Sequence, residues 1–364
     1  MGMLFAANCR TTAMGIMPHR DVARALKLVL ELDVPFWPQL PQISYYEDMY
    51  VQFSQHFPGI VVDTEERRLH FDSARFGDEL ADYSVKMEHA ETFVLSSDYS
   101  AVYHRFLEED LSGYVAVRGQ LIGPVSFGFR VADENNRPII YNDDVRTILF
   151  DFIQRKINAQ YRELLRKNRH AFVWLDEPGL GWVFSGLSGY SDVQAKRDYQ
   201  SFLGGLESIK ALHLCANVNL QFLLSMGTEL VSFDAYQMEL MPKAYAPSVA
   251  DFVSSGGTIC WGIVPTDSDN LNRHTPASLA DILTGYWEVV SANTGLPLKV
   301  IAGHSLIAPA RCCLKNIGQT GGAGESGNTD GVCLDLAPEE RLVEKAFGYL
   351  GRISAMLRER YGLD

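Results

Sequence analysis

The stretch Ala171-Phe172-Val173-Trp174-Leu175-Asp176-Glu177-Pro178-Gly179 places two carboxylates and a Pro-Gly turn directly after a run of apolar residues. An uninterrupted apolar run of this length predicts a strand covered on both faces, because a half-exposed strand would alternate polar and apolar residues. Such strands are typical of parallel sheets flanked by helices. The stretch therefore predicts a buried parallel strand with two acidic side chains at its C-terminal end.

Similar short runs recur along the chain, separated by longer stretches with apolar residues at helical spacing. In one of these stretches, Val145, Leu149 and Ile153 recur every four residues, which is typical of an amphipathic helix. The predicted strands are Thr11–Met14, Val34–Trp37, Tyr114–Val117, Ala171–Leu175, Leu212–Cys215, Glu229–Phe233, Thr258–Ile263 and Leu298–Ala302. The predicted helices are Asp21–Leu32, Asp143–Lys167, Tyr190–Leu206, Val249–Ser255, Pro276–Ala292 and Pro338–Arg360. Eight strands with intervening helices favour an α/β fold of the (β/α)8 TIM-barrel type, with a doubly wound open sheet as the alternative.

We expect residues 1–364 to form a single barrel domain with one insertion. The segment Pro41–Ser97, between the second and third strands, is much longer than a crossover requires and is rich in aromatic residues. Its short alternating runs, Gly59–Asp63 and Arg68–Phe71, predict a β-hairpin-rich insertion over one barrel mouth. Such an insertion would act as a structural lid or dimer contact, or it would shape the substrate site.

The composition and net charge of the chain argue against some classes of binding partner. The chain has 364 residues, with 47% apolar and 21% charged residues, which is typical of a globular protein. Its 32 basic and 45 acidic residues give a net charge of −13, and an acidic chain repels nucleic-acid phosphates. No apolar run approaches the ~18 residues of a membrane span, and Met1–Arg10 lacks the features of a signal peptide. We therefore expect a cytoplasmic protein with six reduced cysteines and no nucleic-acid or membrane partner.

Metal-binding residue types follow several predicted strands. His213 and Cys215 end one strand and point to the same face, Asp234 ends the next, and Cys312 and Cys313 follow the last. One imidazole, one or two thiolates and a carboxylate are the types of ligand that hold zinc in tetrahedral sites. Zinc with two thiolate ligands suits the activation of a substrate thiol for alkylation better than it suits hydrolysis. His304 is the main competitor for a ligand role.

Polar residues on the same rim are candidates for substrate binding. Asp176 and Glu177 could hold a substrate ammonium group or act as acid and base, unless one caps the next helix or pairs with a barrel arginine. His19, in the turn after the first strand, is expected to contact substrate or to begin a helix. Ser126 lies in a further turn, Gly123-Pro124-Val125-Ser126, and is also assigned to substrate binding.

These residues, taken in order, resemble the superfamily that unites uroporphyrinogen decarboxylase with cobalamin-independent methionine synthase. The chain looks closest to the C-terminal catalytic barrel of the synthase and its stand-alone relatives, over nearly its whole length. The resemblance is carried by Gly15-Ile16-Met17-Pro18, Gly123-Pro124-Val125-Ser126, Leu175-Asp176-Glu177-Pro178-Gly179-Leu180, His213-Leu214-Cys215 and Arg311-Cys312-Cys313-Leu314-Lys315. It implies a zinc-dependent methyltransferase that activates a thiol as a zinc-bound thiolate, with Cys312 rather than Cys313 as the last ligand.

The chain also departs from the family pattern. Asp234 stands where the family has a glutamate ligand, and Ile16 replaces a serine that binds the amino acid. The histidine that carries a proton in the synthase is missing after the seventh strand, where Asp267 is the nearest titratable group and our catalytic candidate. The resemblance leaves two methyl donors, a folate or a corrinoid protein, and the insertion could provide a docking face for the latter. The alternatives are a metal-independent decarboxylase and a non-catalytic protein that binds a thiol or a corrinoid.

Overall fold

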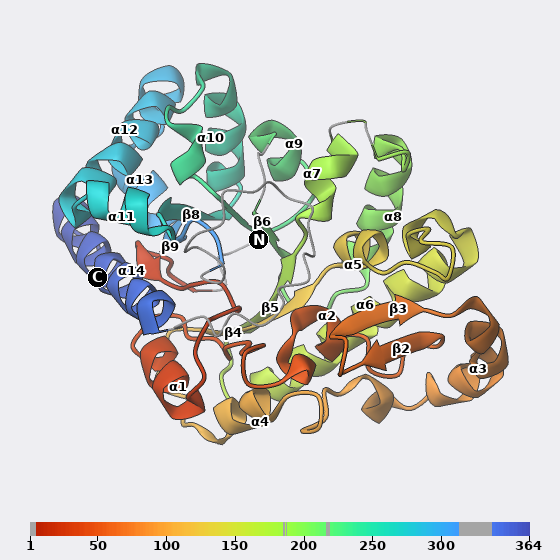
Figure 1. Cartoon of the computed structure of the whole chain (residues 1–364). Coiled ribbons are helices and arrows are strands. Elements are labelled where there is room, and N and C mark those ends of the chain that lie inside the picture. Colours follow the sequence, from red (N-terminus) through yellow and green to blue (C-terminus); the bar gives the residue numbers. More distant parts are fainter. Residues whose placement is uncertain (1–4, 185, 187, 216–218, 313–336) are drawn as a thin grey trace.

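The computed structural model describes residues 5–184, 186, 188–215, 219–312 and 337–364 (Figure 1). Its main sheet has seven parallel strands in the order β1-β9-β8-β7-β6-β5-β4. These strands are β1 (Arg10–Thr11), β4 (Val117–Ile122), β5 (Ala171–Asp176), β6 (Ala211–Leu214), β7 (Leu230–Phe233), β8 (Thr258–Val264) and β9 (Ser305–Pro309). Because β1 pairs with β9, the first and last strands among the described residues are neighbours, and the sheet curls as in a TIM-like fold.

An extended segment lies between the two edge strands, β1 and β4. The backbone N–H of Val34 donates to the Thr11 carbonyl at 3.0 Å, and the N–H of Arg118 donates to the Pro35 carbonyl at 3.0 Å. Phe36 forms an isolated parallel bridge with Arg118. The predicted strand Val34–Trp37 is therefore present as an extended segment with isolated bridges instead of a regular ladder, and it links one edge of the curled sheet to the other.

Helices surround the sheet, with α8, α10, α12 and α14 distributed around the central strands (Figure 1). All six predicted helices are confirmed, with shifts of a few residues at their ends. The helices outside segment 41–97 are α1 (Val22–Leu30), α4 (Ala101–Glu108), α5 (Pro124–Arg130), α6 (Asp143–Leu165), α7 (Gly179–Phe184), α8 (Asp192–Gly204), α9 (Leu220–Leu224), α10 (Ala246–Ser254), α11 (Ser268–Arg273), α12 (Pro276–Thr294), α13 (Leu298–Gly303) and α14 (Ala337–Tyr361), with the 3-10 turns η3 (Ile139–Tyr141), η4 (Tyr236–Met238) and η5 (Lys243–Tyr245). Within the described ranges, none of the helices combines the length and apolar character needed to cross a membrane.

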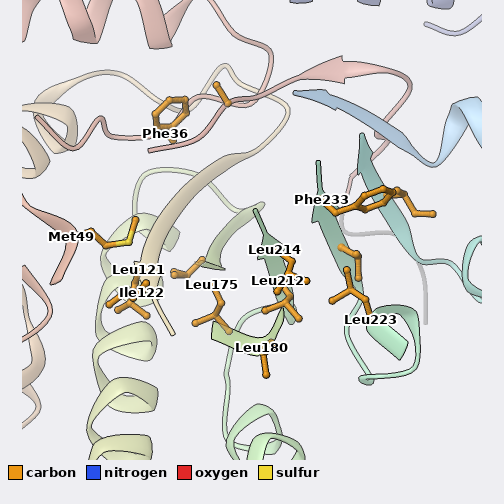
Figure 2. Close-up of a cluster of buried hydrophobic side chains, with 14 of the residues drawn as sticks. Phe36, Met49, Leu121, Ile122, Leu175, Leu180, Leu212, Leu214, Leu223 and Phe233 are labelled. Atoms are coloured by element: carbon orange, nitrogen blue, oxygen red, sulfur yellow. The ribbon is translucent and has the colours of Figure 1, made fainter. Parts of the chain in front are cut away.

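Two groups of buried side chains cover the two faces of the sheet. Leu212 and Leu214 of β6 belong to the large cluster between strands and helices, which also contains Phe233 (Figure 2). Trp174 and Ala211 belong to a smaller, separate cluster. Because side chains alternate along a strand, this second cluster lies inside the curled sheet. The two clusters explain why the strands read as continuous apolar runs.

Two predicted strands are misplaced. The run Leu298–Ala302 forms helix α13, and the last strand is Ser305–Pro309; short apolar runs do not distinguish a buried strand from a buried helical turn. The third strand lies at Val117–Ile122 instead of Tyr114–Val117. Its polar residues Arg118 and Gln120 interrupt the apolar pattern, although both are fully buried.

The segment 41–97 contains more helix than strand, and the two predicted alternating runs form its one antiparallel strand pair, so the segment as a whole is not rich in hairpins. Its elements are η1 (Tyr45–Glu47), α2 (Met49–Gln52), β2 (Ile60–Asp63), β3 (Arg68–Phe71), α3 (Ser73–Lys86) and η2 (Ala90–Phe93), with β2 and β3 paired in register. Phe57 and Phe93 pack their rings against Phe152 of α6 at centroid distances of 5.1 and 5.8 Å. The segment therefore contributes to the same core as the barrel helices.

Candidate active site

The strand register brings four inward-facing side chains into one row across β5, β6, β7 and β8. Asp176 pairs with His213, His213 with Ser232, and Ser232 with Cys260. His213 lies between Leu212 and Leu214, which face the outer helices (Figure 2), so its imidazole faces the inside of the sheet. In barrels of this type the C-terminal end of the strands is where active sites form.

The imidazole of His213 is held between two side chains. Its Nδ1 lies 2.9 Å from the Ser232 hydroxyl and its Nε2 lies 2.6 Å from the Cys215 sulfur. Burial, together with the positive charge of Arg118, lowers the pKa of His213 to about 3. The imidazole is therefore neutral at pH 7, which is the form that binds metal ions. A hydrogen bond at one ring nitrogen that directs the other nitrogen is also typical of metal-binding histidines.

Cys215 lies in a strongly acidic surrounding. Burial raises the pKa of its thiol well above the usual value, and Cys312, Asp176 and Asp234 raise it further, whereas Arg311 lowers it. Both predicted thiol ligands follow the C-terminal ends of their strands, Cys215 after β6 and Cys312 after β9. A bound cation would reverse the effect, because it stabilises a coordinating thiolate.

The donor types at this end of the barrel fit zinc, but the described ranges contain no group of three or more His, Cys, Asp or Glu side chains arranged to hold a metal ion. The contact between His213 and Cys215 is present. The Asp234 carboxylate instead accepts a hydrogen bond from Arg311 Nε at 2.7 Å. Cys313, the alternative to Cys312, lies outside the described residues.

Asp176 is the carboxylate that ends β5. It is 8% exposed, and one of its oxygens accepts a hydrogen bond from the Trp174 indole at 3.2 Å. Burial raises its pKa to about 7, although the charge of Arg118 and this hydrogen bond oppose the rise. An approaching substrate cation would favour its ionised form.

Glu177 and Ser126 lie close by and are joined to each other. The Glu177 carboxylate accepts hydrogen bonds from the backbone N–H groups of Val125 and Ser126, at 3.1 and 2.8 Å, and from the Ser126 hydroxyl at 2.6 Å. The Ser126 hydroxyl in turn accepts a bond from the N–H of Gly179. Glu177 thus caps α5 from another strand, and the two side chains connect α5 with α7.

Replacing Gly123 with alanine is expected to destabilise the protein. A Cβ at this position would lie 2.1 Å from the Glu177 carboxylate, which is fully buried and held by three hydrogen bonds. We expect a loss on the order of 1–3 kcal/mol in the free energy of unfolding, measured by chemical denaturation. Gly77→Ala is the control, because no atom lies within 4 Å of a Cβ there; equal stability of the two variants would contradict this account.

The remaining predicted site residues have other local surroundings. Asp267 begins α11 as its N-cap and accepts bonds from the backbone and side-chain nitrogens of Asn270. His19 is fully buried beside the N-terminal ends of α1 and α14, and neither ring nitrogen has a partner among the described residues. His304 lies between α13 and the start of β9, so it is at the opposite end of the barrel and does not compete for a ligand role.

Sequence reasoning missed one feature of the site, the buried Arg118. Arg118 is fully buried inside the sheet, with its guanidinium 4.6 Å from the ring centroid of Phe36 and 4.3 Å from that of Trp174. Its charge acts on both Asp176 and His213. A basic residue next to an apolar run was the available signal for Arg118.

Solved structures of other proteins have folds similar to that of this chain. No protein-family model matches the chain, and no curated protein does. A solved structure of a B12-independent methionine synthase from Shewanella sp. W3-18-1, in complex with selenomethionine, is 11% identical with a TM-score of 0.53, over 96% of this chain and 98% of that one. A methyltransferase from Methanosarcina mazei is 14% identical with a TM-score of 0.53, over 98% of this chain and 94% of that one. The resemblance inferred from the motifs is thus confirmed at the level of the fold, which this chain shares with a methionine synthase and a methyltransferase.

Proposed function

We propose that this chain is a methyltransferase that methylates the sulfur of a small thiol, with zinc held by His213, Cys215 and Cys312. The observation that carries the proposal is the contact between His213 Nε2 and the Cys215 sulfur, near the C-terminal end of β6 in a fold that resembles those of a methionine synthase and a methyltransferase. Zinc with thiolate ligands would supply the positive charge that lowers the pKa of a substrate thiol and leaves it nucleophilic near neutral pH.

The chain's own residues would orient the reactants. Asp176 would hold an ammonium group of the substrate, with its side chain oriented by the hydrogen bond from the Trp174 indole. Ser232 directs the imidazole of His213. In the reaction, the thiol loses its proton, a sulfur lone pair forms the new S–C bond, and the bond between the methyl carbon and its donor breaks with both electrons remaining on the donor.

Methyl transfer to thiols tests the proposal. The purified chain is incubated with methylcobalamin or a methylated folate and with a panel of thiols, and the thioether is measured by mass spectrometry. We expect zinc-dependent product with at least one pair. Absence of product from every pair, in protein that contains zinc, would contradict the proposed activity.

The metal-independent decarboxylase makes a different prediction, because its activity would not require zinc. No described feature favours it: in the turn after β1, His19 is fully buried and the Arg20 N–H donates to Glu340. Measurement of zinc in the purified protein separates this alternative from the methyltransferase.

Replacing Asp176 with asparagine is expected to lower kcat/KM about 10- to 100-fold for thiols that carry an amino group, because a buried charge-assisted contact is lost. The loss should be much smaller for a thiol without an amino group, so 2-aminoethanethiol and 2-mercaptoethanol form a matched substrate pair. Asp143→Asn, at an exposed position that begins α6, is the control. Equal losses for the two thiols would show that Asp176 does not recognise an ammonium group.

A further inference from the structure

The indole of Trp174 is the centre of a group of contacts inside the curled sheet. Trp174 is 1% exposed and lies on β5, two residues before Asp176. Its N–H donates to one carboxylate oxygen of Asp176 at 3.2 Å, and its ring centroid lies 5.3 Å from that of the His213 imidazole. A buried indole N–H requires an acceptor, and here the acceptor is the carboxylate proposed to bind substrate. The position of the indole therefore influences where the Asp176 carboxylate points.

Arg118 of β4 contacts this indole. Its guanidinium carbon lies 4.3 Å from the ring centroid of Trp174 and 4.6 Å from that of Phe36. The guanidinium nitrogens donate to uncharged oxygens, among them Thr12 Oγ1 and Gln120 Oε1 at 3.1 Å each. Burial lowers the pKa of Arg118 from 12.5 to about 10, so the group is still charged at pH 7. This buried cation is therefore held against aromatic rings by neutral hydrogen-bond acceptors, which is the setting in which a cation–π contact is strongest.

The register of β4 and β5 explains how these side chains meet. Arg118 pairs with Phe172, and Gln120 pairs with Trp174. Residues two apart on a strand face the same side, so Phe172, Trp174 and Asp176 follow one another along one face of β5. The long arginine side chain extends from the level of Phe172 to the indole of Trp174, and the indole N–H extends to Asp176. The second oxygen of Asp176 has no hydrogen-bond partner among the described residues.

We propose that Arg118 is a positioning residue, which fixes the indole of Trp174 so that the indole holds one oxygen of Asp176 and leaves the other for a substrate ammonium group. This inference rests on the part of the proposed function in which Asp176 binds an ammonium group, and it involves no metal ion. A cation over the face of an indole draws electron density from the ring and makes its N–H a stronger donor. Arg118 therefore acts on the substrate through Trp174 and Asp176.

Substrate preference tests this role in the assay of methyl transfer. Trp174→Phe keeps an aromatic ring and removes the N–H, so we expect KM for 2-aminoethanethiol to rise about 3- to 30-fold, with little change in kcat or in KM for 2-mercaptoethanol. Arg118→Met should have the same effect, and the double variant should lose no more than either single variant, because both changes break the same chain of contacts. Arg118→Lys, which keeps the charge, should recover part of the loss. The matched control is Trp287→Phe, because the buried N–H of Trp287 has no partner among the described residues.

The indole N–H resonances of the five tryptophans, measured by nuclear magnetic resonance, give a readout that does not depend on activity. The resonance that Trp174→Phe removes belongs to Trp174, and both Arg118→Met and Asp176→Asn should move it upfield, whereas Trp287→Phe should not. If Arg118→Met does not fold, Arg118→Lys supplies the same comparison. A Trp174 resonance that the Arg118 variants leave unchanged would overturn the positioning inference. An upfield shift with equal KM changes for the two thiols would instead overturn the proposed recognition of an ammonium group by Asp176.

Discussion

Replacing Cys215 with serine is expected to lower the zinc content of the purified protein at least tenfold and to abolish measurable methyl transfer. The sulfur of Cys215 is in contact with His213 Nε2, so its loss would remove both the proposed thiolate ligand and the partner of the imidazole. A serine hydroxyl is not deprotonated near pH 7 and does not replace a thiolate on zinc. Cys312→Ser should have the same effect.

Zinc bound per chain, measured by elemental analysis, checks this expectation. Cys9→Ser is a suitable control, because Cys9 is also buried but donates to the Ala302 carbonyl at the other end of the barrel. Unchanged zinc in both Cys215→Ser and Cys312→Ser would remove the site assignment.

Replacing Lys156 with methionine is expected to stabilise the protein at pH 7. Lys156 lies on α6, is 1% exposed, and its Nζ has no hydrogen-bond partner among the described residues. The ammonium group lies 5.4 Å from the ring centroid of Phe152. Burial lowers the pKa of Lys156 from 10.5 to about 7, which corresponds to a penalty on the order of 3–5 kcal/mol for carrying the charge in the folded state.

The sign of the pH dependence follows from these two values. Above pH 10.5 the amine is neutral in both states and there is no penalty; as the pH falls toward 7 the unfolded state is protonated first, and stability is lost. Lys156→Met removes this loss, so its melting temperature should exceed that of the wild type by on the order of 5 °C at pH 7 and by much less near pH 9.5. Lys86→Met, at an exposed position on α3, serves as the control. A difference that does not shrink with rising pH would contradict the explanation.

The fold was predictable where one physical signal dominated. Strands β5 and β8 are apolar on both faces, and α6 has a clear helical period, so their type and position follow from the sequence. The hydrophobic pattern failed to predict the structure where a strand carries buried polar residues or where an apolar run is very short. The side chains of Arg118 and Gln120 are buried inside the curled sheet, so the sequence of β4 does not show the apolar run of a buried strand. The run Leu298–Ala302 is too short for its apolar character to distinguish a helix from a strand.

The residue types of the candidate site were predictable from the sequence, but most of the hydrogen bonds and ion pairs between these residues were not. The spacing of His213 and Cys215 on one strand is sufficient to place them together, and the structure has them in contact. Nothing in the sequence around Glu177 distinguishes a cap of α5 from a substrate ligand, because the donors are backbone groups more than fifty residues away. The pairing of Asp234 with Arg311 also joins residues far apart in the chain.

X-ray absorption at the zinc edge, with and without a thiol substrate, tests the central claim most directly. The account predicts a first shell with one nitrogen and two sulfur ligands from the protein, and one additional sulfur after a reactive thiol is added. A zinc ion without sulfur ligands, or a sulfur shell that the substrate leaves unchanged, would contradict it.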